Sequence, residues 1–542
     1  MILLRILLAM SVFWGTLGGS PQRQFCQEGN IWPPFHEDWQ YQVDSGNRFS
    51  SPAVGDGIIV FKYMQYTEPV SFHLVCLNAS NGKFIWSYVD KLEENGKGFA
   101  INPARDHEGS PTIFEDRVYV TSQTHLYSIN LSDGSMFWKK KYPDIIAYDL
   151  FYISPLVFST GATTNVVLKV PYFKTVCHEA SEGQLLWEIK KIEMAISPTL
   201  FNNQTIMTPS HLTFKGSQKS KGLPETPELF GQLVVGDGWI VGYFSDLTFK
   251  KFRYEEIFNR FTLEWSIEDS SFDTINSFMI NKIPTVTPLG IILPLNSGLA
   301  LFNFSGKKIW QSQSKSTTLA TVVGFVALQT SPTCDEIVPI NIRDGLSYGS
   351  IHLPSSLVSH AVPYENGFFV VTMDGLVRCF KGANPPKIST KKIIRFKTYK
   401  GWDDVYLPVM ITNVGGSRMY LELVSNTNFL VPAEGTFLCE SGQSIMIKIS
   451  IISQEQGEKT GHLTINSDGG HADVLAVIDF FDGLPDKKDL NLDNKVDAND
   501  LAIIIQNLGN PAIGQVWERE KRSDLNLDGK IDFFDLELFF VQ

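Results

Sequence analysis

Residues 77–86 hold the pattern that decides the fold: Leu77-Asn-Ala-Ser-Asn-Gly82-Lys-Phe-Ile-Trp86, a turn-forming run with a glycine and then a tryptophan four residues later. The pattern returns as Ile129-Asn-Leu-Ser-Asp-Gly134-Ser-Met-Phe-Trp138 and as Ala180-Ser-Glu-Gly183-Gln-Leu-Leu-Trp187. A Ser-Pro pair opens each segment, at residues 51, 110 and 154, and a fourth pair stands at 197. Later copies are expected at Thr287-Pro288 with Gly306-Lys-Lys-Ile-Trp310, and at Met373-Asp-Gly375-Leu-Val-Arg-Cys-Phe380.

A repeat of roughly forty to sixty residues that contains only strand-like runs is typical of a β-propeller. Each unit would form a four-stranded sheet that buries its faces against its neighbours. The glycine supplies positive φ in the turn between the outer strands, and the tryptophan packs against the next blade. We expect seven or eight blades, with Trp32 and Trp39 beginning the strand that closes the ring.

Residues 27–385 resemble the PQQ-like propeller family, whose repeat carries a similar glycine-to-tryptophan motif. The resemblance raises the alternative of a quinone-dependent dehydrogenase, which holds its quinone with an adjacent Cys-Cys disulfide. The six cysteines are all far apart in the sequence, so PQQ is not expected as a cofactor and no catalytic residue is assigned. The charged run Arg105-Asp-His-Glu108 is a candidate binding loop, although loop charges commonly serve solvation.

The pattern changes over residues 387–480. Short strands are expected near residues 406–413, 419–424, 444–452 and 460–467, separated by glycine-containing turns. This spacing predicts a β-sandwich. The runs Thr412-Asn-Val-Gly415 and Gly461-His-Leu-Thr-Ile-Asn-Ser467 resemble the immunoglobulin-like spacer modules of exported bacterial proteins.

Two twelve-residue loops near the C-terminus repeat the same oxygen-rich pattern. Loop positions 1, 3, 5, 7, 9 and 12 are Asp489, Asn491, Asp493, Lys495, Asp497 and Asp500, and then Asp524, Asn526, Asp528, Lys530, Asp532 and Asp535, all offset by 524 − 489 = 35 residues. Calcium takes six to eight oxygen ligands, and such a loop supplies alternate side chains plus the position-7 carbonyl. The sequence therefore predicts two calcium ions, with the lysines giving only backbone oxygens. Gly529 and Asn494 suit the sharp turn at position 6, and Val496 and Ile531 are expected to face inward.

A helix is expected after each loop, over residues 500–508 and 535–541, but none before the first loop. Residues 482–542 therefore resemble a dockerin domain with duplicated loops of type I character. The resemblance implies a cohesin-like protein partner, recognised through loop positions 10 and 11, which here are Ala498 and Asn499, and Phe533 and Phe534. These pairs depart from the Ser-Thr pairs of many dockerins. The alternatives are an acidic tail without metal, and calcium loops that only stabilise the C-terminus.

Composition and charge limit the other function classes. The net charge of −12 argues against nucleic acid and anionic membranes as partners. Arg5, the apolar run that follows it and the small residues near Gly18 predict a signal peptide over residues 1–20, with an uncleaved membrane anchor as the alternative. No later run is long enough to span a membrane. The widely spaced cysteines allow one or two disulfides of unknown pairing.

The expected architecture is mainly β: a seven- or eight-bladed PQQ-like propeller, an immunoglobulin-like sandwich and a small helical dockerin. We expect an exported, non-catalytic propeller protein, secreted or on the cell surface or in the periplasm, that docks onto a cohesin-like partner. A dockerin-tethered enzyme, quinone-dependent or polysaccharide-active, is the alternative, and a polysaccharide remains a further partner. The third hypothesis is that the calcium loops act only within the molecule.

Overall fold

The computed structural model describes residues 19–20, 25–43, 48–65, 70–91, 109–122, 124–142, 155–159, 164–170, 174–190, 199–202, 205–208, 211–214, 220–222, 233–244, 246–255, 260–269, 282–312, 319–330, 335–400, 405–481, 488–491, 495–510, 523–525 and 530–540. The chain divides into two compact units, Met1–Ala383 and Asn384–Gln542. The candidate loop Arg105-Asp-His-Glu108 lies outside the described residues, as do the first 18 residues of the expected signal peptide.

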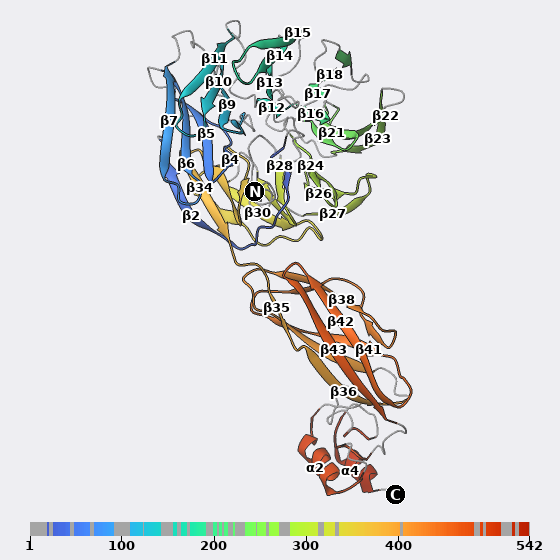
Figure 1. Ribbon diagram of the computed structural model, residues 1–542. Helices are drawn as coiled ribbons and strands as arrows, with labels where there is room; N and C mark the ends of the chain where they lie inside the picture. The colour runs from blue at the N-terminus through green and yellow to red at the C-terminus, as the bar shows by residue number, and fades with distance from the viewer. Residues whose placement is uncertain are drawn as a thin grey trace, which may run out of the picture. The chain divides into compact units, whose positions relative to one another are not determined.

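The described residues of the first unit form eight sheets of four principal strands, the blades of a propeller (Figure 1). Blade one holds β3 (Arg48–Phe49), β4 (Ala53–Gly55), β5 (Ile58–Gln65), β6 (Ser71–Asn78) and β7 (Phe84–Lys91). Blade two holds β8 (Thr112–Phe114), β9 (Arg117–Thr121), β10 (His125–Asn130) and β11 (Met136–Lys141). Blade three holds β12 (Leu156–Ser159), β13 (Thr164–Val170), β14 (Lys174–Glu179) and β15 (Leu185–Lys190).

Blade four holds β16 (Thr199–Asn202), β17 (Thr205–Thr208), β18 (His211–Phe214) and β19 (Ser220–Gly222). Blade five holds β20 (Val234–Gly236), β21 (Trp239–Tyr243), β22 (Thr248–Glu255) and β23 (Arg260–Glu268). Blade six holds β24 (Thr285–Thr287), β25 (Gly290–Leu295), β26 (Gly298–Phe302) and β27 (Lys308–Gln311). Blades seven and eight hold β1 (Cys26–Gln27), β28 (Leu319–Val323), β29 (Val326–Thr330), β30 (Glu336–Asn341) and β31 (Ile351–His352); and β2 (Phe35–Gln42), β32 (Val362–Tyr364), β33 (Gly367–Val371) and β34 (Leu376–Gly382).

The first strands of neighbouring blades line a common axis. Contacts join β4 to β8, β8 to β12, β16 to β20, β20 to β24, β24 to β28 and β28 to β32, and β32 returns to β4. Side chains from five of these inner strands or their approaches share one apolar cluster, which includes Val54, Val234, Ile283, Leu319 and Val362. The expectation of seven or eight blades is thus resolved as eight among the described strands.

A tryptophan of one blade packs on a glycine of the next blade. The indole of Trp86 in β7 lies against Gly134, where an added Cβ would come within 2.4 Å of Trp86 Cε3. Gly134 has a φ of 72°, which suits glycine, and Trp86 Nε1 donates a hydrogen bond of 2.8 Å to the carbonyl of Leu131. The same pairing joins Trp39 to Gly82, Trp138 to Gly183, Trp265 to Gly306 and Trp310 to Gly345. The expected role of the motif is confirmed at these joints.

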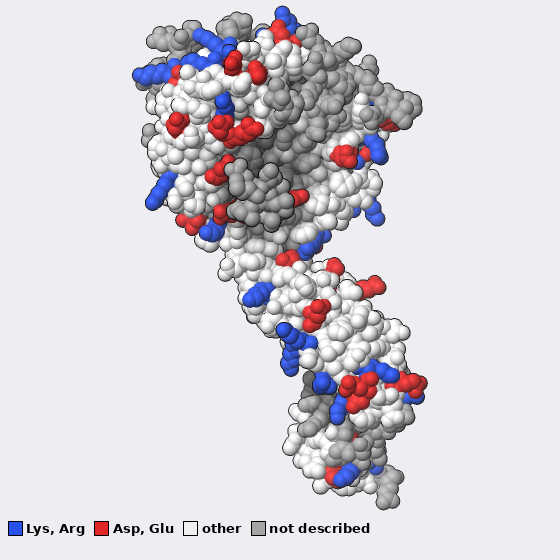
Figure 2. Space-filling model, in the orientation of Figure 1, with Lys and Arg blue, Asp and Glu red and all other residues white. Residues whose placement is uncertain are grey.

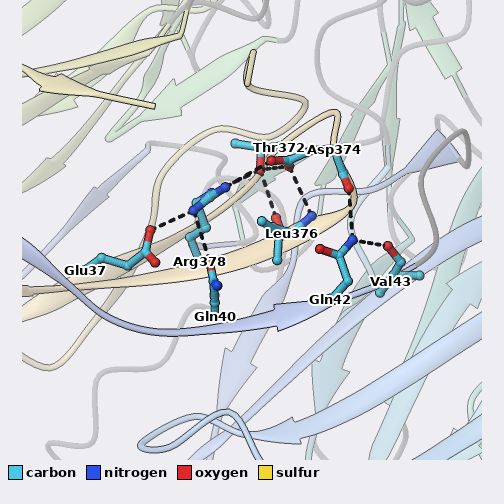
Figure 3. Close-up of polar contacts among 8 residues, drawn as sticks. All are labelled: Glu37, Gln40, Gln42, Val43, Thr372, Asp374, Leu376 and Arg378. Atoms are coloured by element: carbon cyan, nitrogen blue, oxygen red, sulfur yellow. Dashed lines mark hydrogen bonds and ion pairs between the residues drawn. The ribbon is translucent and has the colours of Figure 1, made fainter. Parts of the chain in front are cut away.

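The N-terminal strand β2 closes the ring by pairing antiparallel with β34, and so supplies the outer strand of the eighth blade (Figure 1). The predicted closing strand is therefore present and contains Trp39, but Trp32 precedes it, so that part of the expectation was wrong. Figure 3 shows that Arg378 of β34 fastens it. The buried guanidinium of Arg378 donates to Glu37 Oε2 at 2.8 Å, to Gln40 Oε1 at 3.2 Å and to Asp374 Oδ2 at 3.0 Å.

Two of the later repeat copies were misplaced from the sequence. In the first blade, Ser51-Pro52 comes directly before the inner strand β4. The equivalent pair before β24 is Ile283-Pro284, and not the expected Thr287-Pro288, because Pro288 follows the strand in a turn. Gly375 lies between the second and third strands of its blade and not between the outer two. The eighth blade takes its outer strand from the N-terminus, so this blade has no turn of the kind that contains Gly82.

Residues 388–481 form two facing sheets with a shared apolar core, as the predicted sandwich requires. The first sheet runs in the order β35 (Ile388–Thr390), β37 (Tyr406–Asn413), β41 (Ser444–Ile451) and β39 (Leu430–Pro432). The second runs in the order β36 (Ile393–Tyr399), β43 (Gly470–Phe481), β42 (Gly457–Ser467), β38 (Met419–Ser425) and β40 (Phe437–Cys439). The immunoglobulin-like assignment stays a prediction.

Buried Asn413 explains the Thr-Asn-Val-Gly run of the sandwich. Its Nδ2 donates to the carbonyls of Ser417 at 2.7 Å and Cys439 at 3.1 Å, and its Oδ1 accepts from the backbone of Lys387 and Gly415. One amide therefore satisfies four backbone groups where two sheets meet a turn.

The cysteines Cys26, Cys76, Cys177, Cys379 and Cys439 are free thiols, and Cys334 lies outside the described residues. Burial raises the pKa of Cys76, Cys177 and Cys379 to about 12, so these thiols stay protonated and behave as apolar core side chains. Within the part of the chain that the structure describes, no helix is long and apolar enough to cross a membrane.

We expect Gly134→Ala to destabilise the propeller more than Gly57→Ala. Both residues have positive φ, 72° and 75°, so both variants suffer a backbone penalty of about 1–2 kcal/mol. A Cβ at Gly57 meets nothing within 4 Å, whereas one at Gly134 collides with Trp86 and adds about 1–3 kcal/mol of overpacking. Urea unfolding followed by tryptophan fluorescence measures the difference. Equal losses in the two variants would contradict the proposed joint.

Candidate calcium loops and docking helices

Each C-terminal loop leads directly into a short helix, α2 (Ala498–Asn507) and α4 (Phe533–Phe540). Both helices begin two residues before the predicted starts at Asp500 and Asp535, because the aspartate at loop position 9 caps the helix. Asp497 Oδ1 accepts from the backbone of Asn499 at 2.7 Å, and Asp532 Oδ1 accepts from Phe534 at 2.9 Å. An aspartate at this position satisfies a backbone donor that the first helical turn leaves unpaired.

The aspartate at position 12 ties the two ends of its loop together. Asp500 accepts from the backbone of Asn491 and of Asp497, both at 2.9 Å, and is wholly buried. Asp535, also wholly buried, accepts from Leu525 at 2.7 Å and Asp532 at 2.8 Å. The two loops therefore share one construction at the 35-residue offset. One contact differs between the loops. The backbone N–H that reaches the position-12 aspartate comes from position 3 (Asn491) in the first loop and from position 2 (Leu525) in the second.

The position-1 aspartates are also buried. Asp489 and Asp524 are each 2% exposed, so four carboxylates lie inside a domain with a core of few side chains. Buried carboxylates are costly unless hydrogen bonds or a cation compensate their charge. Carboxylate oxygens are the donors that Ca²⁺ prefers. The buried carboxylates at positions 1 and 12 therefore have the chemistry that a calcium site requires.

The remaining predicted ligands are described only in part. Asp493, Asn526 and Asp528 lie outside the described residues, as do Asn494 and Gly529. The described ranges contain no group of three or more His, Cys, Asp or Glu side chains that could hold a metal. The side chains of Lys495 and Lys530 are exposed, in keeping with a role for their backbone carbonyls only.

A small core joins the two repeats. Leu490, Ile503, Ile504 and Ile531 are buried together, and Leu525, Leu536 and Phe539 pack on them. The backbone of Gly509, just past α2, donates to the carbonyl of Ile531 at 2.8 Å. Ile531 faces inward as predicted, but Val496 at the same position of the first loop is 42% exposed, so that expectation was wrong. The duplicated loops are equivalent in their capping but not in their packing.

The predicted partner-binding residues lie at the start of the two helices, and all four are exposed. Phe533, Phe534 and Phe540 are 77%, 65% and 68% exposed, the highest values for large hydrophobic side chains in the described chain. Phe539 instead packs into the core of the domain. The described α2 and α4 contain no lysine or arginine, and Figure 2 shows a largely uncharged face over α2.

Comparisons with known proteins agree with these features. The family model described as dockerin type I domain matches residues 487–539, and the model described as outer membrane protein assembly factor BamB, a PQQ-like repeat, matches residues 36–152. The chain therefore carries a dockerin type I domain behind a PQQ-like propeller. A dockerin domain implies calcium binding. A search of curated proteins gave no match.

Two solved structures are also similar to this chain. The quinohemoprotein alcohol dehydrogenase from Comamonas testosteroni matches with 13% identity and a TM-score of 0.54 over 70% of this chain and 82% of that chain. BamB from Moraxella catarrhalis matches with 14% identity and a TM-score of 0.42 over 64% of this chain and 98% of that chain. With a TM-score of 0.54 at 13% identity, the likeness to the dehydrogenase shows the propeller fold and nothing about activity. The sequence contains no adjacent cysteines, so the disulfide that the quinone resemblance implies does not fit this chain.

Sequence reasoning missed two joints of the propeller. Trp265 and Gly345 carry the same indole-on-glycine contact as the other copies. Trp265 follows no glycine at the usual spacing, and Gly345 precedes no tryptophan, so each half of the motif stands alone in the sequence. The Asn341-Ile-Arg-Asp-Gly345 turn was the available signal.

We expect Asp500→Ala to loosen α2 even when a chelator has removed all calcium. The substitution leaves the backbone N–H groups of Asn491 and Asp497 without their acceptors, at a cost of about 1–3 kcal/mol for each buried donor. Amide hydrogen exchange of residues 498–507 by mass spectrometry should become faster. Glu537→Ala, an exposed acidic position in α4, is the matched control and should leave that exchange unchanged. Equal protection in Asp500→Ala and the parent chain would rule out this role.

Proposed function

We propose that the chain is an exported, non-catalytic propeller protein that binds two calcium ions at its C-terminus and docks there onto a cohesin-like protein in an extracellular assembly. The observation that carries the proposal is the duplicated loop, in which buried aspartates at positions 1 and 12 recur at an offset of 35 residues within a matched dockerin type I domain.

The proposed calcium ligands are the oxygens at positions 1, 3, 5, 7, 9 and 12 of both loops. The first loop would use Asp489, Asn491, Asp493, the carbonyl of Lys495, Asp497 and Asp500, and the second would use the residues 35 positions later. The buried Asp489 and Asp500 support this assignment because a divalent cation compensates charges that water does not reach. Calcium would then hold the loop ends at the distance that positions the helices.

The proposed docking surface is the exposed beginning of both helices together with Phe540 at the end of α4, and α4 is its main contributor. Its exposed Phe533, Phe534 and Phe540 lie within one eight-residue helix and offer large aromatic anchors. Ala498 and Asn499 occupy the equivalent places on α2 and offer little apolar area. The two faces therefore differ in chemistry, which favours one orientation of the partner over the twofold-related one.

The charge on this surface supports a partner of definite chemistry. Neither helix has a basic side chain, and Glu537 of α4 is exposed. A protein with an apolar depression bordered by lysine or arginine would match both the aromatic anchors and the charge. Cohesin-like domains of the same organism are the first candidates.

We expect calcium uptake to follow the loops one by one. Calorimetric titration of the chelated full chain should give two sites, Asp489→Ala should leave one, and Asp489→Ala with Asp524→Ala should leave none, because each substitution removes a first ligand. Asp116→Ala, which removes an exposed carboxylate of the propeller, is the control for net charge. Two sites remaining in the double variant would contradict the ligand assignment.

We expect the double variant Phe533→Ala with Phe534→Ala to weaken binding of a cohesin-like domain at least about 100-fold, as the loss of two aromatic hot spots implies. Ile505→Ala, an exposed apolar position on α2, should change it little. Both variants should keep their calcium. Surface plasmon resonance against purified cohesin-like domains, with and without chelator, measures the effect. Full binding by the Phe533→Ala and Phe534→Ala chain would place the contact elsewhere, and no binding by the parent chain would refute docking itself.

A further inference from the structure

Strand β1 lies beyond the inner strand of the seventh blade. It pairs parallel with β28, Cys26 beside Val322 and Gln27 beside Val323. The backbone of Val322 donates to the carbonyl of Phe25 at 2.8 Å, and that of Gly324 donates to Gln27 at 3.2 Å. Because β1 also contacts β24 of the preceding blade, the segment lies at the axis that the inner strands surround.

Phe25 anchors this segment. Its side chain is wholly buried in the apolar cluster to which five of the inner strands or their approaches contribute. Its ring meets His360 edge to face, with centroids 5.6 Å apart, and His360 Nδ1 lies 2.9 Å from Ser51 Oγ. The φ of Phe25 is 55°, an unusual value for a bulky residue, which surrounding contacts must hold in place.

A glycine of the seventh blade allows residues 29 and 30 to pass close to its backbone. Gly324, in the turn after β28, approaches it so closely that an added Cβ would lie 2.2 Å from the carbonyl oxygen of Gly29 and 2.4 Å from Asn30 Oδ1. The chain then reaches Trp32, whose backbone donates to Asn366 Oδ1 at 2.9 Å, and continues into β2. Phe25 is thus buried, Cys26 and Gln27 pair with β28, and the exposed Gly29 and Asn30 pass close to Gly324.

We propose that the inner edge of β28 is a strand-accepting site, which takes an extended segment in parallel with one aromatic side chain anchored beside His360, and that residues 25–30 of the same chain fill it. A bare strand edge at the axis would leave backbone groups of β28 without partners in an apolar interior. Addition of a strand supplies those partners, as in peptide recognition by sheet edges. A ligand placed on this part of the axis would first have to displace residues 25–30.

The first test supplies the segment as a separate peptide. A shortened chain that begins at Ile31 should have an unfolding temperature roughly 5 °C or more below that of the parent chain, because it lacks the buried Phe25 and two backbone hydrogen bonds. The peptide Phe-Cys-Gln-Glu-Gly-Asn should bind the shortened chain saturably and restore the unfolding temperature, and the same peptide with alanine in place of phenylalanine should not. An unchanged unfolding temperature, or a folded shortened chain that does not bind the peptide, would overturn the proposal.

The second test keeps the chain intact, in case the shortened chain does not fold. Cys26 is a built-in reporter, because burial and the nearby Glu28 raise its thiol pKa to about 12 and should slow alkylation. Phe25→Ala and Gly324→Ala should each increase the alkylation rate of Cys26 by about tenfold or more, as local opening of the segment becomes easier. Gly57→Ala, with positive φ in the same kind of turn but open space around it, should not. Equal rates in all chains would overturn the proposal.

Discussion

The indole of a tryptophan on a glycine of the next blade is the contact on which the ring depends. Each blade is a small sheet that leaves an apolar face uncovered, so neighbouring blades must meet at a fixed distance and angle. The indole supplies a large flat surface, and its N–H reaches a carbonyl of the adjacent turn, as in Trp310 to Ile342 at 2.7 Å. The glycine matters equally, because the indole occupies the volume of a side chain there. The size of the indole, the direction of its N–H group and the absence of a Cβ on the glycine together determine how neighbouring blades pack.

The same contact crosses the point where the chain closes on itself. Trp39 comes from the N-terminal strand β2, yet it packs on Gly82 of the first blade as the other tryptophans do on theirs. The eighth blade is therefore built from both ends of the propeller sequence and still presents the standard joint. Arg378 adds a polar fastening in which a buried guanidinium meets Glu37 and Asp374 at the edge of solvent. A buried cation of this kind favours the native pairing because any shift of β2 would remove Glu37 and Gln40 from its guanidinium.

The sequence predicted those parts of the molecule whose physical requirement is local. A turn that needs positive φ, a tryptophan at fixed spacing and a twelve-residue loop rich in oxygen all appear as short motifs, so the propeller, the sandwich strands and the loops were predictable. Joints such as Trp265 on Gly306 were not, because Trp265 follows no glycine at the usual spacing and so has no complete motif in its own blade. The parallel strand β1 was missed for the same reason. Two residues beside β28 have no periodicity that a sequence reader could detect. In the calcium loops, spacing assigned Asp500 to position 12 without predicting its burial, and the inward position expected for Val496 was wrong because the two repeats pack unequally.

The closure of the ring by β2 has a consequence for the order of folding. Residues 35–42 have no partner strand until residues 376–382 have been made, so the seam depends on a contact across most of the propeller sequence. Such long-range pairing forms slowly, and an exposed strand edge invites association with other chains meanwhile. Strand β2 has the sequence Phe-His-Glu-Asp-Trp-Gln-Tyr-Gln, which places charged and polar side chains along its unpaired edge. Such side chains disfavour pairing with strands of other chains before β34 is available. We infer that the seam is the last part of the propeller to form, and pulse-labelled hydrogen exchange would then find β2 among the latest strands to gain protection.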